Sequence, residues 1–357
     1  MLPKIIEFKQ MRAILCGYYG KGNGGDEALL ASLLQMLPDN IQPYVLSGNP
    51  SETKQRYQVE SGDRLNTFTI LQTMRHSDIF IWGGGSLIQD ATSIASPFYY
   101  AGLMGIAQKM GLKTIAWAQG IGPLNHPTTR FLAKQCLKGC NIISVRDAGS
   151  AKIVAKWNIP LTLAPDPVWA LETSPVPGLW NLPAPRIAVS LRPHPQLTPL
   201  RLATLTRALI SLQKATQAFI LLLPFQPMKD LKIAEFIHQK LPDDSKILTI
   251  EDPRVLKGIF RGVEMVIGMR FHSLIMGSVE KCRCFAISYD PKVSQLMTDL
   301  EMPGWELSEL PEEANFISQT WINNYANGEA LLSDRIDFFR ERSLIHKEVL
   351  HSVLSDS

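Results

Sequence analysis

The sequence predicts an α/β protein made of two Rossmann-like halves, each a parallel sheet with crossover helices. Apolar β-type runs alternate with helical patterns along the chain, which is typical of parallel sheets whose strands are joined by helices. The length of 357 residues is too great for one ordinary core and fits two domains of roughly 150 to 180 residues each. Hydrophobic residues make up 45% of the chain and charged residues 19%, which provides enough apolar side chains for two hydrophobic cores.

The first half contains a regular series of strands and helices. Strands are expected at residues 12–16, 43–46, 79–82, 114–118 and 142–145. Helices are expected at residues 27–37, 99–110, 130–138 and 149–157. Most of these strands end in a turn that carries glycine or charge. Because ligands of open α/β sheets bind outside the carboxyl ends of the strands, these turns should face one common region.

A proline-rich stretch divides the two halves. Residues 173–186 hold four prolines, and such density removes backbone donors and stiffens the chain, as in an interdomain connection. A second series of strands follows at residues 187–191, 219–223, 247–249, 265–267 and 285–288. The expected division is therefore an N-terminal domain over 1–172, the linker 173–186, a C-terminal domain over 187–332 and a tail over 333–357. The tail reads as an amphipathic helix, and packing back onto the first domain is one option for it.

Composition excludes several classes of protein. A net charge of +3 without a Lys/Arg-rich run argues against nucleic-acid binding. Residues 1–10 carry no small-residue cleavage site, and no stretch of 18 uncharged apolar residues exists, so we expect a cytoplasmic protein. The five cysteines lack the tight CxxC pairs of zinc sites, so reduced structural thiols are expected and no metal.

A glycine-rich segment, residues 16–27, follows the first expected strand and opens a helix. Gly20, Gly22 and Gly25 fit G-x-G-x-x-G, a weak pattern by itself. The second strand ends without the acidic residue that a dinucleotide site needs, and no Gly-Lys-Ser/Thr triplet indicates a P-loop. Asp26 and Glu27 at the helix start would cap amides and repel a phosphate.

Three further strand-end turns share a chemistry, at residues 83–90, 119–123 and 144–147. Their glycines let a ligand approach backbone amides, and their joint position favours a shared binding region. Side chains suited to sugar hydroxyls are Ser86, Gln89, Asp90 and Gln119. Arg146 in the third turn, and Arg192 after the strand 187–191, are planar cations that can hold a carboxylate or phosphate, although a structural ion pair is the alternative.

The most informative stretch is Gly268-Met-Arg-Phe-His-Ser273, followed by Tyr289-Asp-Pro-Lys292. Arg270, His272 and Lys292 place a guanidinium, an imidazole and an ammonium after apolar strands, which suits an anionic substrate and a proton transfer. The other histidines lack such a setting. His346 and His351 in the tail look like exposed helix residues.

Seven segments occur in an order that resembles the polysaccharide pyruvyl transferase family, specifically its CsaB type. They are GYYGKGNGGDEALL (17–30), GGGSLIQD (83–90), QGIGP (119–123), SVRD (144–147), the PDP at 165–167, GMRFHSLI (268–275) and ISYDPKV (287–293). The resemblance extends from about residue 12 to residue 300. It implies a fold like that of GT-B glycosyltransferases, with two Rossmann-like domains facing a cleft. It also implies transfer of a pyruvyl group from phosphoenolpyruvate to a sugar as a cyclic ketal.

The resemblance assigns Arg146, Arg270, His272 and Lys292 to the donor site and to catalysis. Because an imidazole can give up a proton at neutral pH, we expect His272 to be the acid that protonates C3 of phosphoenolpyruvate. It places the acceptor on the N-terminal domain and the donor on the C-terminal one. The remaining predicted substrate-binding residues are Gly20, Asn23, Asp26, Glu27, Gly84, Gly85, Ser86, Gln89, Asp90, Gln119 and Arg192. No cofactor is expected. Asp26 or Glu27 could orient or deprotonate the acceptor hydroxyl, and a plain helix cap is the alternative role. The acceptor implied is a lipid-linked or polysaccharide sugar, such as N-acetylmannosamine of a cell-wall precursor, which would bring the protein to the inner membrane face as a peripheral partner.

Two other functions compete with this hypothesis. A GT-B glycosyltransferase would use a nucleotide sugar, but such enzymes often hold the nucleotide with acidic residues where this chain has Arg-Phe-His and a lysine. A glycan-binding or regulatory module without catalysis would leave the ordered cationic set unexplained. Neither the acceptor sugar, the ketal positions nor the oligomeric state can be read from the sequence.

Overall fold

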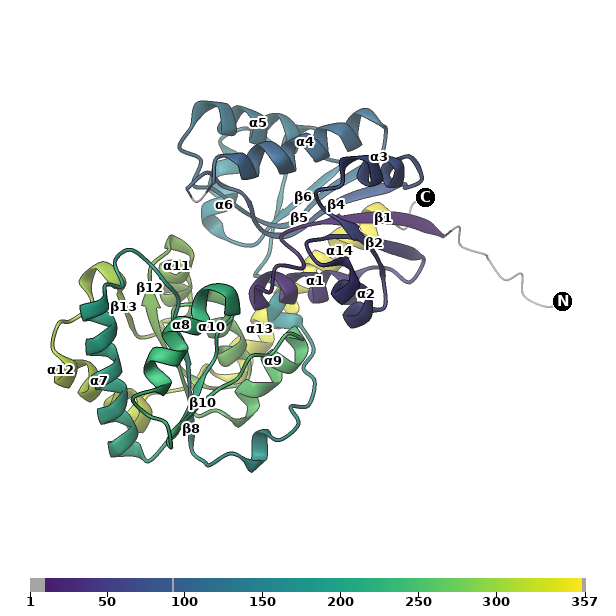
Figure 1. Ribbon diagram of the computed structural model, residues 1–357. Coiled ribbons are helices and arrows are strands. Elements are labelled where there is room, and N and C mark those ends of the chain that lie inside the picture. The colour runs from purple at the N-terminus through teal and green to yellow at the C-terminus, as the bar shows by residue number, and fades with distance from the viewer. Residues whose placement is uncertain (1–9, 92, 355–357) are drawn as a thin grey trace. The chain divides into compact units, whose positions relative to one another are not determined.

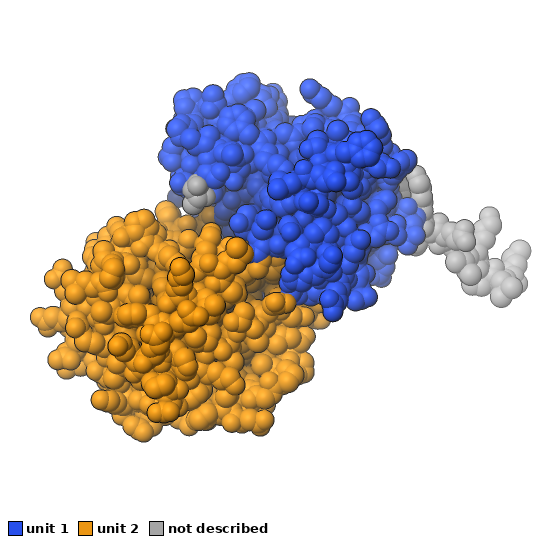
Figure 2. Space-filling view, in the orientation of Figure 1, with its two compact units in different colours: residues 1–21, 29–171, 340–357 blue, residues 22–28, 172–339 orange. Residues whose placement is uncertain are grey.

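The computed structural model describes residues 10–91 and 93–354 and divides into two compact units (Figure 2). Within the described residues, unit 1 holds 10–21, 29–91, 93–171 and 340–354. Unit 2 holds 22–28 and 172–339. The first nine residues of the expected N-terminal domain and the last three of the expected tail lie outside the described residues.

Unit 1 contains, in its described part, a parallel sheet of seven strands (Figure 1). In sheet order these are β3 (Glu60–Asp63), β2 (Ile41–Ser47), β1 (Met11–Cys16), β4 (Ile79–Ile88), β5 (Lys113–Ile121), β6 (Ile142–Val145) and β7 (Thr162–Leu163). The chain order reverses between β1 and β4. The carboxyl ends of these two strands therefore flank the switch point at which doubly wound sheets bind ligands.

Helices cover both faces of this sheet, as the alternation of side chains along β1 requires. Ile14 and Cys16 point into a core shared with helices on one face, and Ala13 and Leu15 point into the core on the other face. The first core is closed by α3 (Thr67–Arg75), α4 (Ala95–Lys109), α5 (Pro127–Lys138) and α6 (Ala148–Ala155). The second is closed by α1 (Gly24–Met36) and α14 (Ile345–Leu354), with Tyr57 at the end of α2 (Pro50–Tyr57) packed against it.

Unit 2 repeats the same strand order with a parallel sheet of six strands among its described residues. These are β10 (Ser245–Ile247), β9 (Phe219–Leu222), β8 (Arg186–Ser190), β11 (Met265–Gly268), β12 (Arg283–Ser288) and β13 (Gly304–Glu306). One face packs on α7 (Pro199–Thr216), α8 (Pro227–His238) and α12 (Ala314–Asn327). The unit further contains α9 (Pro253–Ile259), α10 (Phe271–Val279) and α11 (Pro291–Leu300). The chain order reverses between β8 and β11, which is the position where doubly wound sheets bind ligands.

The two glycine-bearing turns predicted after strands 79–82 and 114–118 are parts of longer strands. β4 continues through Gly83, Gly84 and Gly85 to Ile88, and β5 continues to Ile121. Gly84 and Gly85 have φ of +66° and +94°, and the register between β4 and β5 shifts between Gly85 and Ile88. The segment is thus a β-bulge inside a strand, which explains why glycine occupies both positions.

The segment 49–67, in which the sequence predicts neither a strand nor a helix, contains α2 and β3. β3 has the sequence ESGD, which lacks the apolar run by which strands are recognised, because it is an edge strand. The proline-rich stretch is held within unit 2. Ser174 N donates to Arg254 O at 3.1 Å, and Leu179 is buried.

The tail forms two helices, α13 (Ser333–Ser343) and α14. Leu350 and Leu354 of α14 are buried in the core of unit 1. The expectation that His346 is an exposed helix residue is wrong, since its side chain is completely buried, and His351 is half-buried. Across residues 10–91 and 93–354, we find no helix with the length and hydropathy needed to cross a membrane.

Candidate functional site

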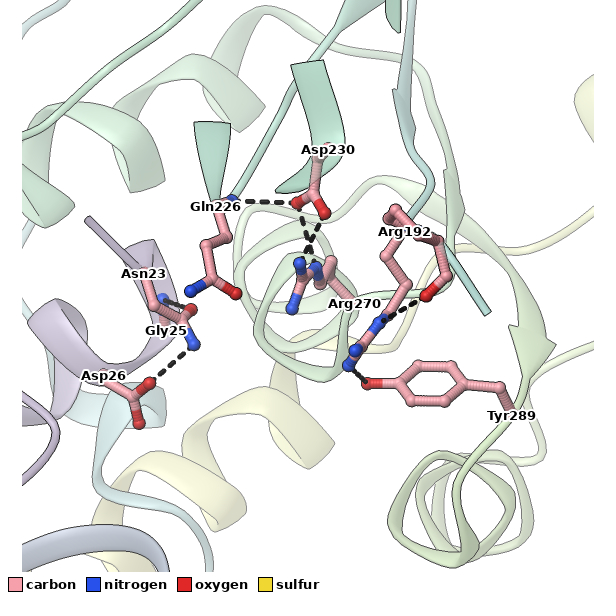
Figure 3. Close-up of polar contacts among 9 residues, drawn as sticks. Asn23, Gly25, Asp26, Arg192, Gln226, Asp230, Arg270 and Tyr289 are labelled. Carbon is pink, nitrogen blue, oxygen red and sulfur yellow. Dashed lines mark hydrogen bonds and ion pairs between the residues drawn. The ribbon is translucent and has the colours of Figure 1, made fainter. Parts of the chain in front are cut away.

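The predicted donor residues of unit 2 follow the carboxyl ends of three adjacent strands. Arg192 lies two residues after β8, Arg270 two residues after β11, and Lys292 in the first turn of α11 after β12. Figure 3 shows Arg192 and Arg270 beside each other, with Tyr289 on the far side of Arg192. Positive charge therefore gathers at the switch point between β8 and β11.

Arg270 is fixed by a carboxylate that the sequence did not reveal. Its Nε donates to Asp230 Oδ2 at 3.1 Å, and its Nη2 forms an ion pair with Asp230 Oδ1. Asp230 lies on α8, is buried, and also accepts a hydrogen bond from Gln226 N at 2.8 Å. Because Nε and Nη2 are held this way, the orientation of the guanidinium is set before any ligand binds. Asp230 had no distinguishing pattern in the sequence, since it lies inside an amphipathic helix.

Arg192 is positioned by an aromatic ring. Its Nη1 donates to the Tyr289 hydroxyl at 2.8 Å, and the guanidinium lies 4.6 Å from the centre of the Tyr289 ring. Its Nε donates to Pro193 O at 3.3 Å. No acid pairs with Arg192 among the described ion pairs, so its charge is compensated by the ring and by neutral oxygens. Such a cation is suited to an anionic ligand.

His272 is the second residue of α10 and packs against the glycine-rich segment. A β-carbon at Gly25 would lie 2.2 Å from His272 Nδ1, so only glycine fits there while the imidazole keeps its place. Gly24 N donates to Phe225 O at 2.7 Å, which holds the segment against the loop after β9. The segment 22–28 and the Arg-Phe-His sequence, nearly 250 residues apart in the chain, are thus brought together in unit 2.

The start of α1 differs from the prediction. The helix begins at Gly24, and its cap is Asn23, whose Oδ1 accepts from Gly25 N at 3.1 Å. Asn23 Nδ2 also donates to Asp26 Oδ2 at 2.5 Å, while Glu27 is buried. Asn23 therefore caps this end of α1. Asp26 lies in the helix's first turn on the same side as Asn23 (Figure 3).

In unit 1, four of the sequence segments converge on Arg146. Its Nη1 forms an ion pair with Asp166 Oδ2 at 2.7 Å, and its Nη2 donates to Ser86 Oγ at 3.2 Å. A β-carbon at Gly120 would lie 3.2 Å from both Arg146 Nε and Ser86 Oγ. Asp166, the acid of the PDP segment, received no role from the sequence. Asp166 does, however, lie in one of the seven segments that carry the resemblance.

Two predicted sugar-binding side chains have structural partners. Burial alone would raise the pKa of Asp90, but hydrogen bonds from Asn125 N, His126 N and the Thr129 hydroxyl outweigh it and lower the pKa to about 2. Gln119 is fully buried, and its Nε2 donates to backbone carbonyl groups of β4 and β5. Both side chains hold the ends of strands and helices together.

The remaining predicted residues of unit 1 are glycines and Gln89. Gly20 has φ of +66°, and a β-carbon there would lie 2.0 Å from Ser47 Oγ. Gly84 and Gly85 form the bulge in β4, and Gln89 is half-buried just after that strand. The conformations of Gly20, Gly84 and Gly85 require glycine whether or not a ligand binds there. Within residues 10–91 and 93–354, no cluster of three or more His, Cys, Asp or Glu side chains could hold a metal ion.

The two parallel sheets with their helices define a GT-B-like protein of two Rossmann-like units, and solved structures share this fold. One is a putative UDP-N-acetylglucosamine 2-epimerase from Listeria monocytogenes, 9% identical with a TM-score of 0.65, covering 98% of this chain and 97% of that one. Another is Anabaena Alr3699/HepE in complex with UDP and glucose, 12% identical with a TM-score of 0.61, covering 97% and 100%. A third is MurG from Acinetobacter baumannii, 11% identical with a TM-score of 0.53, covering 96% and 99%. The predicted fold class is thereby confirmed.

The family follows from the sequence itself. The model of the polysaccharide pyruvyl transferase family matches residues 23–291, most of the chain. The chain therefore belongs to the polysaccharide pyruvyl transferase family, a family of transferases, as the ordered segments predicted. No curated protein gives a significant match.

Proposed function

We propose that this protein is a pyruvyl transferase of the CsaB type that uses phosphoenolpyruvate to form a cyclic ketal on a sugar. The observation that carries the proposal is the set of cations beside His272 at the carboxyl edge of β8, β11 and β12. Phosphoenolpyruvate has a carboxylate and a phosphate, and arginine guanidinium groups match both in geometry and charge.

The donor would be held mainly by unit 2. Arg270, fixed by Asp230, and Arg192, fixed by Tyr289, offer guanidinium groups whose orientation costs little entropy on binding. The N-terminus of α10, which directly follows Arg270, adds the partial positive charge of a helix end. Lys292 supplies a third cation from the next strand end. These groups are suited to a ligand with two anionic ends.

The chemistry assigned to His272 is proton donation to C3 of phosphoenolpyruvate. A C3–H bond forms as C3 becomes a methyl group, and C2 becomes electrophilic. The first acceptor hydroxyl then forms a C–O bond to C2 and gives up its proton, which replaces the proton donated by His272. The second hydroxyl attacks the same carbon, the bond from C2 to the phosphate oxygen breaks, and hydrogen phosphate leaves with the remaining proton. Overall, one diol and one phosphoenolpyruvate give one ketal and one inorganic phosphate.

Arg146 of unit 1 is assigned to charge stabilisation, and Asp26 of unit 2 is assigned to the acceptor. Arg146, held by Asp166 and Ser86, would stabilise the charge that develops during transfer. Asp26, hydrogen-bonded to Asn23, is the candidate to orient or deprotonate the attacking hydroxyl. The acceptor proposed is a sugar of a lipid-linked cell-wall precursor, with N-acetylmannosamine the first to test. Such a substrate would bring the protein to the inner membrane face as a peripheral partner. The proposed reaction uses no cofactor.

The decisive test incubates the protein with phosphoenolpyruvate and a panel of lipid-linked or aryl glycosides. We expect phosphate release that depends on the acceptor, and a product whose mass has increased by a pyruvyl group. His272→Ala should lower kcat by roughly 10²- to 10⁴-fold with a small change in KM, because general acid catalysis acts in the transition state. His76→Ala, at an exposed site at the end of α3, is the control and should behave as wild type. Near-normal phosphate release by His272→Ala would refute the acid assignment.

A second function is favoured by one observation, the fold shared with a protein solved in complex with UDP and glucose. A nucleotide-sugar glycosyltransferase would turn over a UDP-sugar in the absence of phosphoenolpyruvate. That result, with no pyruvylated product from any acceptor, would decide for this alternative.

A further inference from the structure

We infer that His346, on the tail helix α14, is a positioning residue that holds both partners of the Arg146–Asp166 ion pair. The inference rests on the role proposed for Arg146 in pyruvyl transfer. His346 is completely buried in unit 1, and both nitrogens of its ring have hydrogen-bond partners there. It lies far from the segments that mark the family in the sequence.

The two hydrogen bonds of the imidazole fix its tautomer. Nε2 lies 3.0 Å from Pro165 O, and a carbonyl oxygen only accepts, so Nε2 carries the proton. Nδ1 lies 2.9 Å from Ser144 Oγ and accepts from that hydroxyl. The same Ser144 Oγ accepts from Ala118 N at 2.8 Å, so the serine links β5, β6 and α14.

The two hydrogen-bond partners of His346 lie close to the ion pair in the sequence. Pro165 directly precedes Asp166, and Ser144 lies two residues before Arg146 on β6. A single ring therefore connects the two backbone segments that must keep their spacing for Arg146 Nη1 and Asp166 Oδ2 to stay 2.7 Å apart. Asp166 is further held by Val168 N, which donates to its Oδ1 at 3.0 Å.

The helix that carries the ring is itself anchored at this point. Trp117 Nε1 donates to His346 O at 3.0 Å, and the two rings meet edge to face with centroids 5.6 Å apart. Burial lowers the pKa of His346 to about 4, and the nearby charges of Asp166 and Arg146 act on it in opposite directions. The neutral ring at neutral pH is the form that can donate at one nitrogen and accept at the other.

A purely structural role, in which α14 only fills the core, is separable from positioning. Leu350 of the same helix is equally buried but packs in the core formed by β strands and α1. Leu350→Ala creates a cavity without removing either hydrogen bond of His346. It is the matched control, because it destabilises the helix but leaves the ion pair's supports in place.

The experiment compares His346→Ala, His346→Gln, His346→Asn and Leu350→Ala in the full chain. Hydrogen–deuterium exchange at the backbone amides of Arg146 and Val168 measures directly whether His346 stabilises the segments around the ion pair. This measurement needs no substrate. We expect faster exchange at both amides in His346→Ala and not in Leu350→Ala. Gln places its amide near the Nε2 position and should restore slow exchange at Val168, whereas Asn reaches only the Ser144 side and should not.

Kinetics provide the second readout. His346→Ala should lower kcat/KM for phosphoenolpyruvate by roughly 10- to 100-fold, as losses of supporting partners around a site often do, and His346→Gln should recover most of it. Leu350→Ala should stay near wild type at a temperature where it is folded. Equal losses in Leu350→Ala and His346→Ala, or unchanged exchange in His346→Ala, would overturn the positioning role. If the wild-type protein does not turn over phosphoenolpyruvate, the proposed function is wrong. The exchange measurements still test whether His346 supports the ion pair, because they need no substrate.

Discussion

At the scale of single residues, Gly25 connects the glycine-rich segment to the proposed acid. A β-carbon there would collide with His272 Nδ1, and the colliding group is the end of a side chain that can rotate away. Gly25→Ala should therefore cost little stability but displace the imidazole. Because a misplacement of about 1 Å can cost roughly 10²-fold in rate, we expect kcat to fall by about that factor with a small change in melting temperature.

The control for this prediction is Gly102→Ala on α4. A β-carbon at Gly102 meets nothing within 4 Å, and its φ is ordinary. Alanine should stabilise the helix by about 0.5 to 1 kcal/mol and leave the rate unchanged. Thermal unfolding and phosphate release measure both variants. A Gly25→Ala enzyme with wild-type kcat would show that the contact has no bearing on catalysis.

Sequence reasoning found the cations of the candidate site but not the acids that hold them. Arg146, Arg270 and His272 follow apolar strands and so stand out by position alone. Asp166 and Asp230 bind them only through the folded structure, 20 and 40 residues away in the chain. A buried arginine needs such a partner, but nothing local says which acid supplies it.

At the scale of elements, the apolar central strands could be predicted and the polar edges could not. β1, β6 and β11 are largely buried and consist mostly of apolar residues, as parallel strands do. β3 and β7 end the sheet of unit 1, and β13 ends that of unit 2; all three are short and partly exposed. The sequence predicts a turn where β4 has its bulge, because both turns and β-bulges are rich in glycine.

The helix α14 should give unit 1 a measurable dependence on pH. The pKa of His346 falls from its ordinary value of 6.5 to about 4 on folding, so between these values the unfolded chain binds more protons. The contribution of this neutral histidine is fully present above about pH 6.5. It is lost as the pH falls toward 4, by about 3 kcal/mol in total.

Denaturant unfolding at several pH values measures this loss. The His346→Gln variant has no titrating group at this position, so its stability should depend less on pH across the same window. The difference between wild type and variant isolates His346 from the carboxylates that titrate lower down. Parallel curves for the two proteins from pH 6.5 to 4 would contradict the prediction.

At the scale of the whole molecule, the chain builds two similar sheets and then returns to the first. Each sheet places its switch point between the first strand and the strand after the third. The predicted residues lie after strand ends in both sheets or, in β4 and β5, in the last part of the strand. The tail then contributes Leu350 and Leu354 to the core of unit 1 rather than to unit 2. The core of unit 1 is therefore completed by α14, which lies more than 170 residues after the rest of that core.

This connectivity predicts that removing α14 harms the two units unequally. A chain ending at Leu344 exposes the core behind β1, β4 and β5, and it loses the hydrogen bonds of Trp117 and Ser144 to His346. Exchange of backbone amides should therefore rise strongly in β5 and β6 and stay near wild type in β8, β9 and β11, whose core holds no residue of α14. Mass spectrometry of exchanged peptides resolves the two sheets. An equal rise in both would mean that the units unfold together and that the tail stabilises the molecule as one body.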